Sequence, residues 1–321
     1  MPNSAPTDSG LLSVGLPAFN EEEMAPRAAD VISALLEQAQ IPHELIFVDD
    51  GSRDRTWARI QEKSRALPQV RGVRFSRNFG KESAMYAGME ASVGEYVVIM
   101  DVDLQDPPSL LPQMLQGIRQ EGYDCVATRR VTRAGEPKVR SFFARMFYRL
   151  INRISKTEIV DGARDFRMMT RQMVESILSL HEVSRFSKGI FSWVGYRTKW
   201  LEYENIARVA GETKWSFWKL LLYSIDGIIG FSTFPLAIAS VVGVLFCVVA
   251  FILILFFFFK TLIWGDPVAG FPATICIILL LGGIQLFCVG ILGQYLSKTY
   301  LETKKRPIYI AREVVGKDQS T

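Results

Sequence analysis

Two long uncharged segments near the C-terminal end constrain the fold of this 321-residue chain more than any other feature. Residues 235–259 contain no charged side chain, and residues 267–297 contain none either. A helix needs about 20 apolar residues to cross a bilayer. A soluble core rarely needs two such segments in succession. The sequence therefore predicts two transmembrane helices, at about residues 235–259 and 270–293.

The charges around this hairpin predict its orientation. The loop at residues 260–268 has one lysine and one aspartate, whereas several basic residues flank the two ends of the hairpin. By the positive-inside rule both ends face the cytoplasm. Residues 1–10 are a polar, disordered tail without a signal-peptide pattern. We therefore expect a cytosolic domain at residues 11–210, the hairpin at 234–295 and a cytosolic tail at 296–321. The flanking basic residues are Lys214, Lys219, Lys298, Lys304, Lys305 and Arg306.

Strand-like and helix-like segments alternate through the expected cytosolic domain. Apolar runs at residues 12–18, 44–48, 70–75 and 95–100 are typical of buried strands, and the segments between them are typical of helices. This alternation predicts an α/β fold with a doubly wound, mostly parallel sheet. Ligands bind such sheets at the C-terminal ends of the strands.

An acidic cluster follows the strand expected at residues 95–100. Asp101, Asp103 and Gln105 place two carboxylates and an amide at the end of this strand. Oxygen ligands of this kind hold Mg²⁺ and leave positions for phosphate oxygens. The alternative is a solvated acidic turn, because residues 106–109 are also a good helix start. The buried strand and the membrane hairpin favour the metal site.

A basic amphipathic segment spans residues 138–156. Arg145, Arg149 and Arg153 recur beside apolar residues at helical spacing. Such a helix suits the interface of an anionic membrane, although the pattern also fits a helix packed on the domain core or on a second subunit. Residues 211–233 form a further amphipathic segment. The net charge of +4 is modest and no nucleic-acid-binding motif is present, so we expect no nucleic-acid partner.

Four ordered motifs resemble those of family 2 glycosyltransferases. They are Leu16-Pro17-Ala18-Phe19-Asn20-Glu21, Val48-Asp49-Asp50-Gly51-Ser52, Asp101-Val102-Asp103-Leu104-Gln105-Asp106-Pro107 and Asp165-Phe166-Arg167-Met168-Met169. With the C-terminal hairpin, they are most similar to the polyprenyl-phosphate glycosyltransferases, which include dolichyl-phosphate mannose synthase and the bactoprenol glucosyltransferases. The resemblance covers nearly the whole chain. In one departure, Ala163-Arg164 precede Asp165 where the family often has glycine.

The resemblance implies a GT-A fold, a nucleotide-sugar donor, Mg²⁺ or Mn²⁺, and inversion at the anomeric carbon. It implies nucleoside binding by Pro17, Phe19, Glu21, Asp49 and Asp50, and binding of the metal diphosphate by Asp101 and Asp103 with Gln105 nearby. Arg208 and Lys214 belong to a motif that lies near the phosphates in the family, and Lys81 is a further candidate for donor binding. The candidate catalytic residues are Asp165, Asp103 and Arg129.

The implied acceptor is a polyprenyl phosphate on the cytoplasmic face of a bacterial plasma membrane. Its phosphate oxygen is already anionic near neutral pH, so a strong general base is less necessary than for a hydroxyl acceptor. Asp165 is then a candidate for positioning the acceptor or holding an arginine, with base catalysis as an open alternative, unless it is only a buried ion pair with Arg164 or Arg167. The Gln-x-x-Arg-Trp motif of processive synthases is absent, which favours transfer of a single sugar.

The expected donor is UDP-glucose. UDP-N-acetylglucosamine, another UDP-sugar and GDP-mannose remain open, as does a membrane-anchored binding protein without turnover. A homo-oligomer and a small membrane flippase that acts on the product are further expectations from the resemblance.

Overall fold

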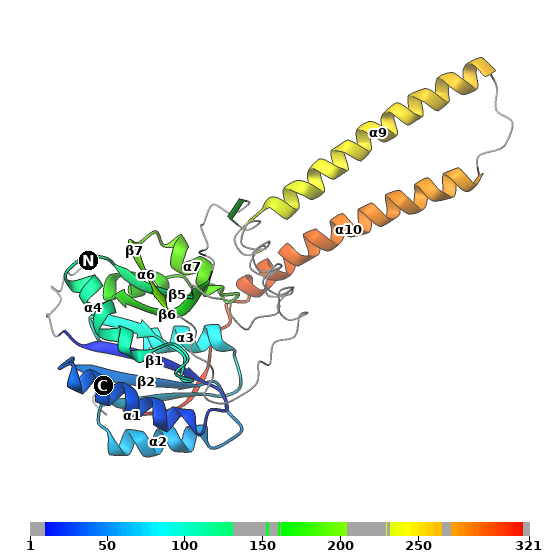
Figure 1. Cartoon of the computed structure of the whole chain (residues 1–321). Coiled ribbons are helices and arrows are strands. Elements are labelled where there is room, and N and C mark those ends of the chain that lie inside the picture. The colour runs from blue at the N-terminus through cyan, green and yellow to red at the C-terminus, as the bar shows by residue number, and fades with distance from the viewer. Residues whose placement is uncertain are drawn as a thin grey trace.

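The computed structural model describes residues 10–130, 152–153, 160, 162–203, 229, 232–264 and 271–316. Within these residues, an α/β domain carries a long helical hairpin that projects from it (Figure 1). The helix expected at residues 138–156 and the amphipathic segment at 211–233 lie almost entirely outside the described residues.

The described strands form one eight-stranded sheet in the order β7-β5-β6-β4-β1-β2-β3-β8. Their bounds are β1 (Leu12–Ala18), β2 (His43–Asp49), β3 (Val70–Phe75), β4 (Tyr96–Ile99), β5 (Cys125–Arg130), β6 (Ala163–Thr170), β7 (Thr198–Tyr203) and β8 (Ala311–Val315). β1 is parallel to β2 and β4, β2 to β3, and β5 to β7. β6 is antiparallel to β4 and β5, and β8 is antiparallel to β3.

The expected α/β class is confirmed, and four of the seven strand pairings in this mixed sheet are parallel, with β6 and β8 running against the other described strands. The parallel core β3-β2-β1-β4 matches the alternation of strands and helices along the chain, because a helical crossover returns each strand in the same direction. β8 reaches the sheet from the end of the hairpin instead, and β6 joins after that alternation has ended. Their directions are therefore not imposed by the βα pattern.

Helices cover both faces of the sheet. One face carries α1 (Met24–Gln38), α2 (Thr56–Ala66) and α4 (Leu111–Arg119), and the other carries α3 (Lys81–Glu90), α6 (Arg171–Leu178) and α7 (Ser187–Trp193). Side chains alternate along each strand, so Leu45 and Phe47 of β2 pack in the first layer while Ile46 and Val48 pack against α3. A short 3₁₀ turn, η1 (Pro108–Leu110), leads into α4.

The hairpin consists of α9 (Phe234–Trp264, 31 residues) and α10 (Phe271–Thr303, 33 residues). Both helices are long and apolar enough to cross a membrane, over Phe234–Leu253 and Leu280–Thr303. They begin near the positions that the sequence predicts but extend further at their C-terminal ends. The last turn of α10, at residues 300–303, is called its foot here and contacts the domain. The Glu302 carboxylate accepts hydrogen bonds from the backbone N–H groups of Val183 and Ser184 at 3.1 and 3.0 Å.

The segment expected to be a cytosolic tail is partly folded. α10 continues to Thr303, and β8 at Ala311–Val315 forms an edge of the sheet beside β3. The chain thus leaves the domain for the hairpin and returns to the same sheet.

Candidate functional site

A cavity of about 390 Å³ opens at the C-terminal ends of the parallel strands β1, β2 and β4. Parallel strands bring the loops that follow them to one edge of the sheet, which is the usual ligand site of such folds. Seven of the residues that line it were predicted from the sequence; six come from three of the motifs, and the seventh is Lys81. The lining consists of Pro17, Ala18, Phe19, Glu21, Asp50, Asn78, Gly80, Lys81, Ala84, Asp101, Val102 and Asp103.

Asp50 points into this cavity from the turn after β2. Its carboxylate accepts hydrogen bonds from the backbone N–H groups of Phe79, at 2.6 Å, and Gly80, at 3.0 Å. Burial raises the pKa of Asp50 to about 6, and the two N–H groups oppose that rise. Asp50 is therefore a hydrogen-bond acceptor whose charge depends on pH in the range just below neutral.

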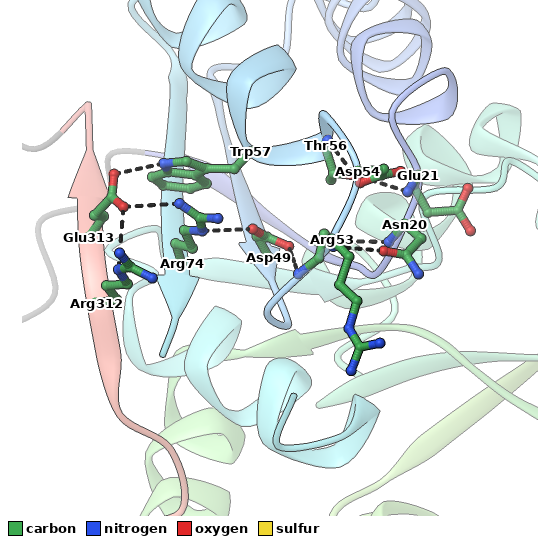
Figure 2. A network of polar contacts seen from close by, with 11 residues as sticks. Asn20, Glu21, Asp49, Arg53, Asp54, Thr56, Trp57, Arg74, Arg312 and Glu313 are labelled. Atoms are coloured by element: carbon green, nitrogen blue, oxygen red, sulfur yellow. Dashed lines mark hydrogen bonds and ion pairs between the residues drawn. The ribbon is translucent and has the colours of Figure 1, made fainter. Parts of the chain in front are cut away.

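Asp49 lies beneath the turn and does not line the cavity. Its side chain is fully buried, with Arg74 Nε 3.4 Å from Oδ2, and Oδ1 accepts a hydrogen bond from Ser52 N at 2.9 Å (Figure 2). Successive side chains of an extended segment point in opposite directions, so Asp49 and Asp50 cannot both face the cavity. The structure gives Asp49 a supporting position, and direct contact with a nucleoside stays a prediction.

Gly51 makes this turn possible. Its φ is +68°, and a Cβ there would lie 2.5 Å from the carbonyl carbon of Arg77. Only glycine combines this conformation with so close an approach of two loops. The loop at residues 76–80 consequently lies against the turn and supplies Asn78 and Gly80 to the cavity.

Lys81 joins the acidic end of β4 to β6. Its Nζ lies 2.7 Å from Asp101 Oδ1 and 2.6 Å from Asp165 Oδ2. Lys81 is the first residue of α3, and Asp165 is 84 positions further along the chain. The structure therefore brings three residues that the sequence predicted separately into one cluster.

The charges in this cluster hold each other ionised. Burial favours the neutral form of Asp165, but Lys81 and Lys188 outweigh it and hold the pKa of Asp165 well below its usual range. Burial likewise favours neutral Lys81, yet Asp165 and Asp101 raise the pKa of Lys81 above its ordinary value. Lys81 and Asp165 are therefore both charged at neutral pH, and Asp165 does not supply a free general base.

The residues at this edge fit a divalent metal that takes further ligands from a phosphate. Asp101 and Asp103 both line the cavity. Two carboxylates are typical of Mg²⁺ sites that are completed by substrate oxygens. The described residues contain no group of three or more His, Cys, Asp or Glu side chains that could hold a metal ion without a substrate. Gln105 is buried and does not line the cavity, so its part in metal binding stays a prediction.

A second polar cluster supports Asp101 from the side. Arg164 Nε lies 3.3 Å from Asp106 Oδ1, and its Nη2 lies 3.9 Å from Asp101 Oδ2. Asp106 is buried and also accepts a hydrogen bond from the Tyr203 hydroxyl. The arginine that departs from the family motif therefore has a fixed anchor and faces the acidic cluster.

The sequence reasoning missed several residues of the site. Asp106 belongs to the third motif but was given no role at the site, and Tyr203 comes from β7, far along the chain. Glu82 follows Lys81, accepts hydrogen bonds from Ser187 N and Oγ, and has its pKa raised to about 7 by burial. No local spacing reveals these contacts. The polar loop after β3 was the one available signal for Asn78.

Of the predicted residues that the structure describes, four do not line the cavity: Asp49, Gln105, Arg129 and Asp165. Arg129 is ion-paired with Glu202 and does not line the cavity, so a catalytic role for it stays a prediction. Arg208 and Lys214 lie outside the described residues.

A family model described as glycosyl transferase family 2 matches residues 13–178. A prophage bactoprenol glucosyl transferase homolog of Escherichia coli strain K12 is 40% identical over 303 residues, which are 94% of this chain and 99% of that protein. A bactoprenol glucosyl transferase of Shigella phage SfX is 39% identical over 301 residues, covering 94% of this chain and 98% of its own length.

Among solved structures, glucosyl-3-phosphoglycerate synthase from Mycobacterium tuberculosis, in complex with Mn²⁺, UDP and phosphoglyceric acid, aligns with a TM-score of 0.46 at 22% identity over 69% of this chain and 77% of that chain. A likeness of this degree carries no argument about the site. The family assignment rests on the matched family model and on the near-full-length relatives. The chain belongs to glycosyl transferase family 2, and the enzyme class that its motifs predicted is confirmed.

Proposed function

We propose that this glycosyltransferase transfers a single glucose from UDP-glucose to a polyprenyl phosphate, with inversion at the anomeric carbon. The observation that carries the proposal is the 39% identity, over 94% of this chain, to a protein named bactoprenol glucosyl transferase. The site supports it independently, because the cavity combines a nucleoside-sized recess with an acidic edge.

The donor binds with its nucleoside beside β1 and the turn after β2. Phe19 and Pro17 give an apolar wall, and Asp50 gives an acceptor for a base or ribose donor. The diphosphate then lies toward Asp101 and Asp103, with Lys81 on the other side of Asp101. Arg208 and Lys214 would add further cations at the phosphates.

Asp101 and Asp103 would hold Mg²⁺ or Mn²⁺ together with the donor diphosphate. When bound, the metal acts as a Lewis acid that neutralises the charge on the leaving phosphate. Lys81 contributes a second positive charge at this edge, and it holds Asp165 in its ionised form.

The acceptor phosphate brings its own nucleophilic oxygen. Asp165 therefore positions groups and does not need to remove a proton, which agrees with its pKa below the usual range. Arg164 supplies a guanidinium that faces the acidic cluster from the Asp106 side and is suited to bind an acceptor phosphate.

The hairpin keeps the site close to the acceptor. In this proposal α9 and α10 cross the membrane, both ends of the hairpin face the cytoplasm, and the α/β domain lies at the cytoplasmic surface. A homo-oligomer, and a flippase that moves the product across the membrane, belong to the same proposal.

A donor screen tests the function directly. Purified full-length protein is incubated with undecaprenyl phosphate, Mg²⁺ or Mn²⁺, and UDP-glucose, UDP-N-acetylglucosamine or GDP-mannose in parallel, and the lipid product is identified by mass. A hexosyl lipid from UDP-glucose is expected, and Asp103→Ala should remove nearly all of it. A product from another donor alone would replace the assigned sugar. UDP binding without any lipid product would favour a binding protein.

A further inference from the structure

Strand β8 brings the end of the chain back to the nucleotide side of the domain. Only residues 304–310 separate it from the foot of α10. β8 pairs with β3, and the backbone N–H of Ser76, directly after β3, donates to the Ile310 carbonyl at 3.0 Å. The Tyr309 ring stacks on Phe75 with a centroid separation of 4.7 Å. The segment after the hairpin is therefore attached to the strand whose loop supplies Asn78 and Gly80 to the cavity.

Glu313 is the side chain of β8 that reaches across to the domain (Figure 2). Its Oε2 accepts a hydrogen bond from Trp57 Nε1 at 2.9 Å, and its Oε1 lies 3.0 Å from Arg74 Nη1. The Arg74 guanidinium also lies over the Trp57 ring, 5.9 Å from its centroid. Glu313 thus contributes, together with Trp57, to the position of the Arg74 guanidinium.

Arg74 in turn supports the buried Asp49. The Asp49 carboxylate is 0% exposed, and Oδ2 makes no hydrogen bond within the described part of the chain. Its neighbouring cation is Arg74, with Nε 3.4 Å away. A buried carboxylate is strongly disfavoured unless a positive charge or hydrogen bonds compensate it. The position of Arg74 therefore affects how well Asp49 is held in the turn.

Asp49 is connected by hydrogen bonds to the segment that forms one wall of the cavity. Its Oδ1 accepts a hydrogen bond from Ser52 N, and Ser52 Oγ accepts one from Asn20 N at 2.9 Å. Asn20 lies between Phe19 and Glu21, which both line the cavity. A continuous chain of polar contacts thus connects β8 with the nucleoside side of the cavity, as Figure 2 shows.

We propose that Glu313 is a positioning residue for donor binding, which acts through Arg74 and Asp49 on the turn at residues 49–52. The C-terminal strand thereby couples the foot of the hairpin to the nucleoside side of the cavity. The identity of the ligand as a UDP-sugar rests on the proposed function. A β8 that only closes the edge of the sheet would stabilise the domain without any preferential effect on nucleotide affinity.

Glu313→Gln is the informative variant, because a glutamine oxygen can still accept the Trp57 hydrogen bond while the charge beside Arg74 is lost. The matched control is Glu121→Gln. Glu121 is 41% exposed and pairs with Lys199 at 2.6 Å, whereas Glu313 is 38% exposed and pairs with Arg74 at 3.0 Å. Both variants are made in the full-length protein and compared by UDP affinity in the presence of Mn²⁺, by KM and kcat, and by melting temperature.

We expect Glu313→Gln to raise the Kd for UDP and the KM for the donor about three- to tenfold, with kcat within about twofold of wild type. Glu121→Gln should leave all three unchanged, and the two variants should melt within a few degrees of each other. Wild-type UDP affinity in Glu313→Gln would overturn the proposal. So would a fall in kcat and melting temperature with an unchanged KM, because that pattern indicates a purely structural strand.

Hydrogen exchange of residues 49–56 without any ligand separates this proposal from the proposed function. Faster exchange there in Glu313→Gln than in Glu121→Gln is expected, whatever the reaction turns out to be. Equal exchange in the two variants would overturn the positioning role even if glucose transfer is confirmed. A wild-type protein without transferase activity would remove the proposed function and leave the exchange result intact.

Discussion

Replacing Lys81 by methionine tests whether the site depends on the ammonium between Asp101 and Asp165. Methionine keeps most of the volume of the aliphatic stem and removes the charge. Lys81 Nζ contacts Asp101 Oδ1 at 2.7 Å and Asp165 Oδ2 at 2.6 Å, so both carboxylates lose their shared partner in one substitution. We expect Asp101 and Asp165 to repel each other in the variant, and the acidic edge to lose the geometry needed for transfer.

The exposed fractions of the three side chains determine how much activity Lys81→Met is expected to lose. Truncating one partner of a buried, hydrogen-bonded charge pair costs about 2–5 kcal/mol, whereas exposed ion pairs contribute about 0–1 kcal/mol. Lys81 is 44% exposed, while Asp101 is 24% and Asp165 20% exposed, so the cluster lies between these limits. Because solvent partly screens this cluster, we expect Lys81→Met to lose about 2 kcal/mol of transition-state stabilisation. This loss corresponds to a decrease of roughly thirtyfold in kcat/KM.

The assay is transfer from UDP-glucose to undecaprenyl phosphate at varied concentrations of each substrate. Lys81→Arg keeps the charge and should retain more activity than Lys81→Met. Lys199→Met is the control. Lys199 Nζ lies 2.6 Å from Glu121 Oε1, and neither residue lines the cavity. The reasoning is refuted if Lys81→Met has the kcat/KM of wild type, or if Lys81→Met and Lys199→Met lose activity equally.

Three further predictions concern pH, packing and metal. The pKa of Asp50 is raised to about 6, so its carboxylate gains a proton as pH falls through 6. Calorimetry should therefore show weaker binding of UDP-glucose below that pH in the wild-type protein. The Asp50→Asn variant should show no such pH dependence of binding. Asp106→Ala removes the buried acceptor of Tyr203 and Arg164, which should lower the free energy of unfolding by about 2–4 kcal/mol, measured by denaturant titration, with Asp106→Asn less affected. Chelation should abolish transfer and Mn²⁺ or Mg²⁺ should restore it; full activity after exhaustive chelation would remove the metal from the proposal.

The elements that the sequence predicted best are those whose pattern is local. The runs at residues 12–18 and 70–75 match β1 and β3 residue for residue, because a buried apolar strand bounded by turn residues leaves a clear local signal. β8 was missed because its five residues include an arginine and a glutamate, and most of them are exposed. Its position depends on pairing with β3, more than 230 residues earlier, and no local propensity contains that information.

In the candidate site, too, the features with a local sequence pattern were predicted and those that depend on distant contacts were not. Three of the four motifs lie at the C-terminal ends of β1, β2 and β4, and the cavity accordingly contains Phe19, Asp50 and Asp103. Which of two neighbouring carboxylates faces the cavity depends on the direction of the side chain, and the motif alone did not separate Asp49 from Asp50. The contact between Lys81 and Asp165 depends on β6 lying beside β4, which follows from the sheet order and not from spacing along the chain.

In the proposed function, the two attachments of the hairpin to the domain would hold the cavity in a fixed orientation toward a lipid acceptor. A single flexible tether would let the domain swivel above the membrane, so that the acidic edge faces the lipid phosphate only part of the time. Here Glu302 at the foot of α10 binds the backbone of Val183 and Ser184, and β8 binds β3. One attachment is to the loop between α6 and α7 and the other is to the edge of the sheet, so together they restrict that rotation. The entropy of the domain's orientation is then lost once in the free enzyme and is not lost again at each transfer. The second attachment also contains Glu313, and in our proposal its contact with Arg74 supports the nucleoside side of the cavity, so one strand would serve both the orientation of the domain and the binding of the donor.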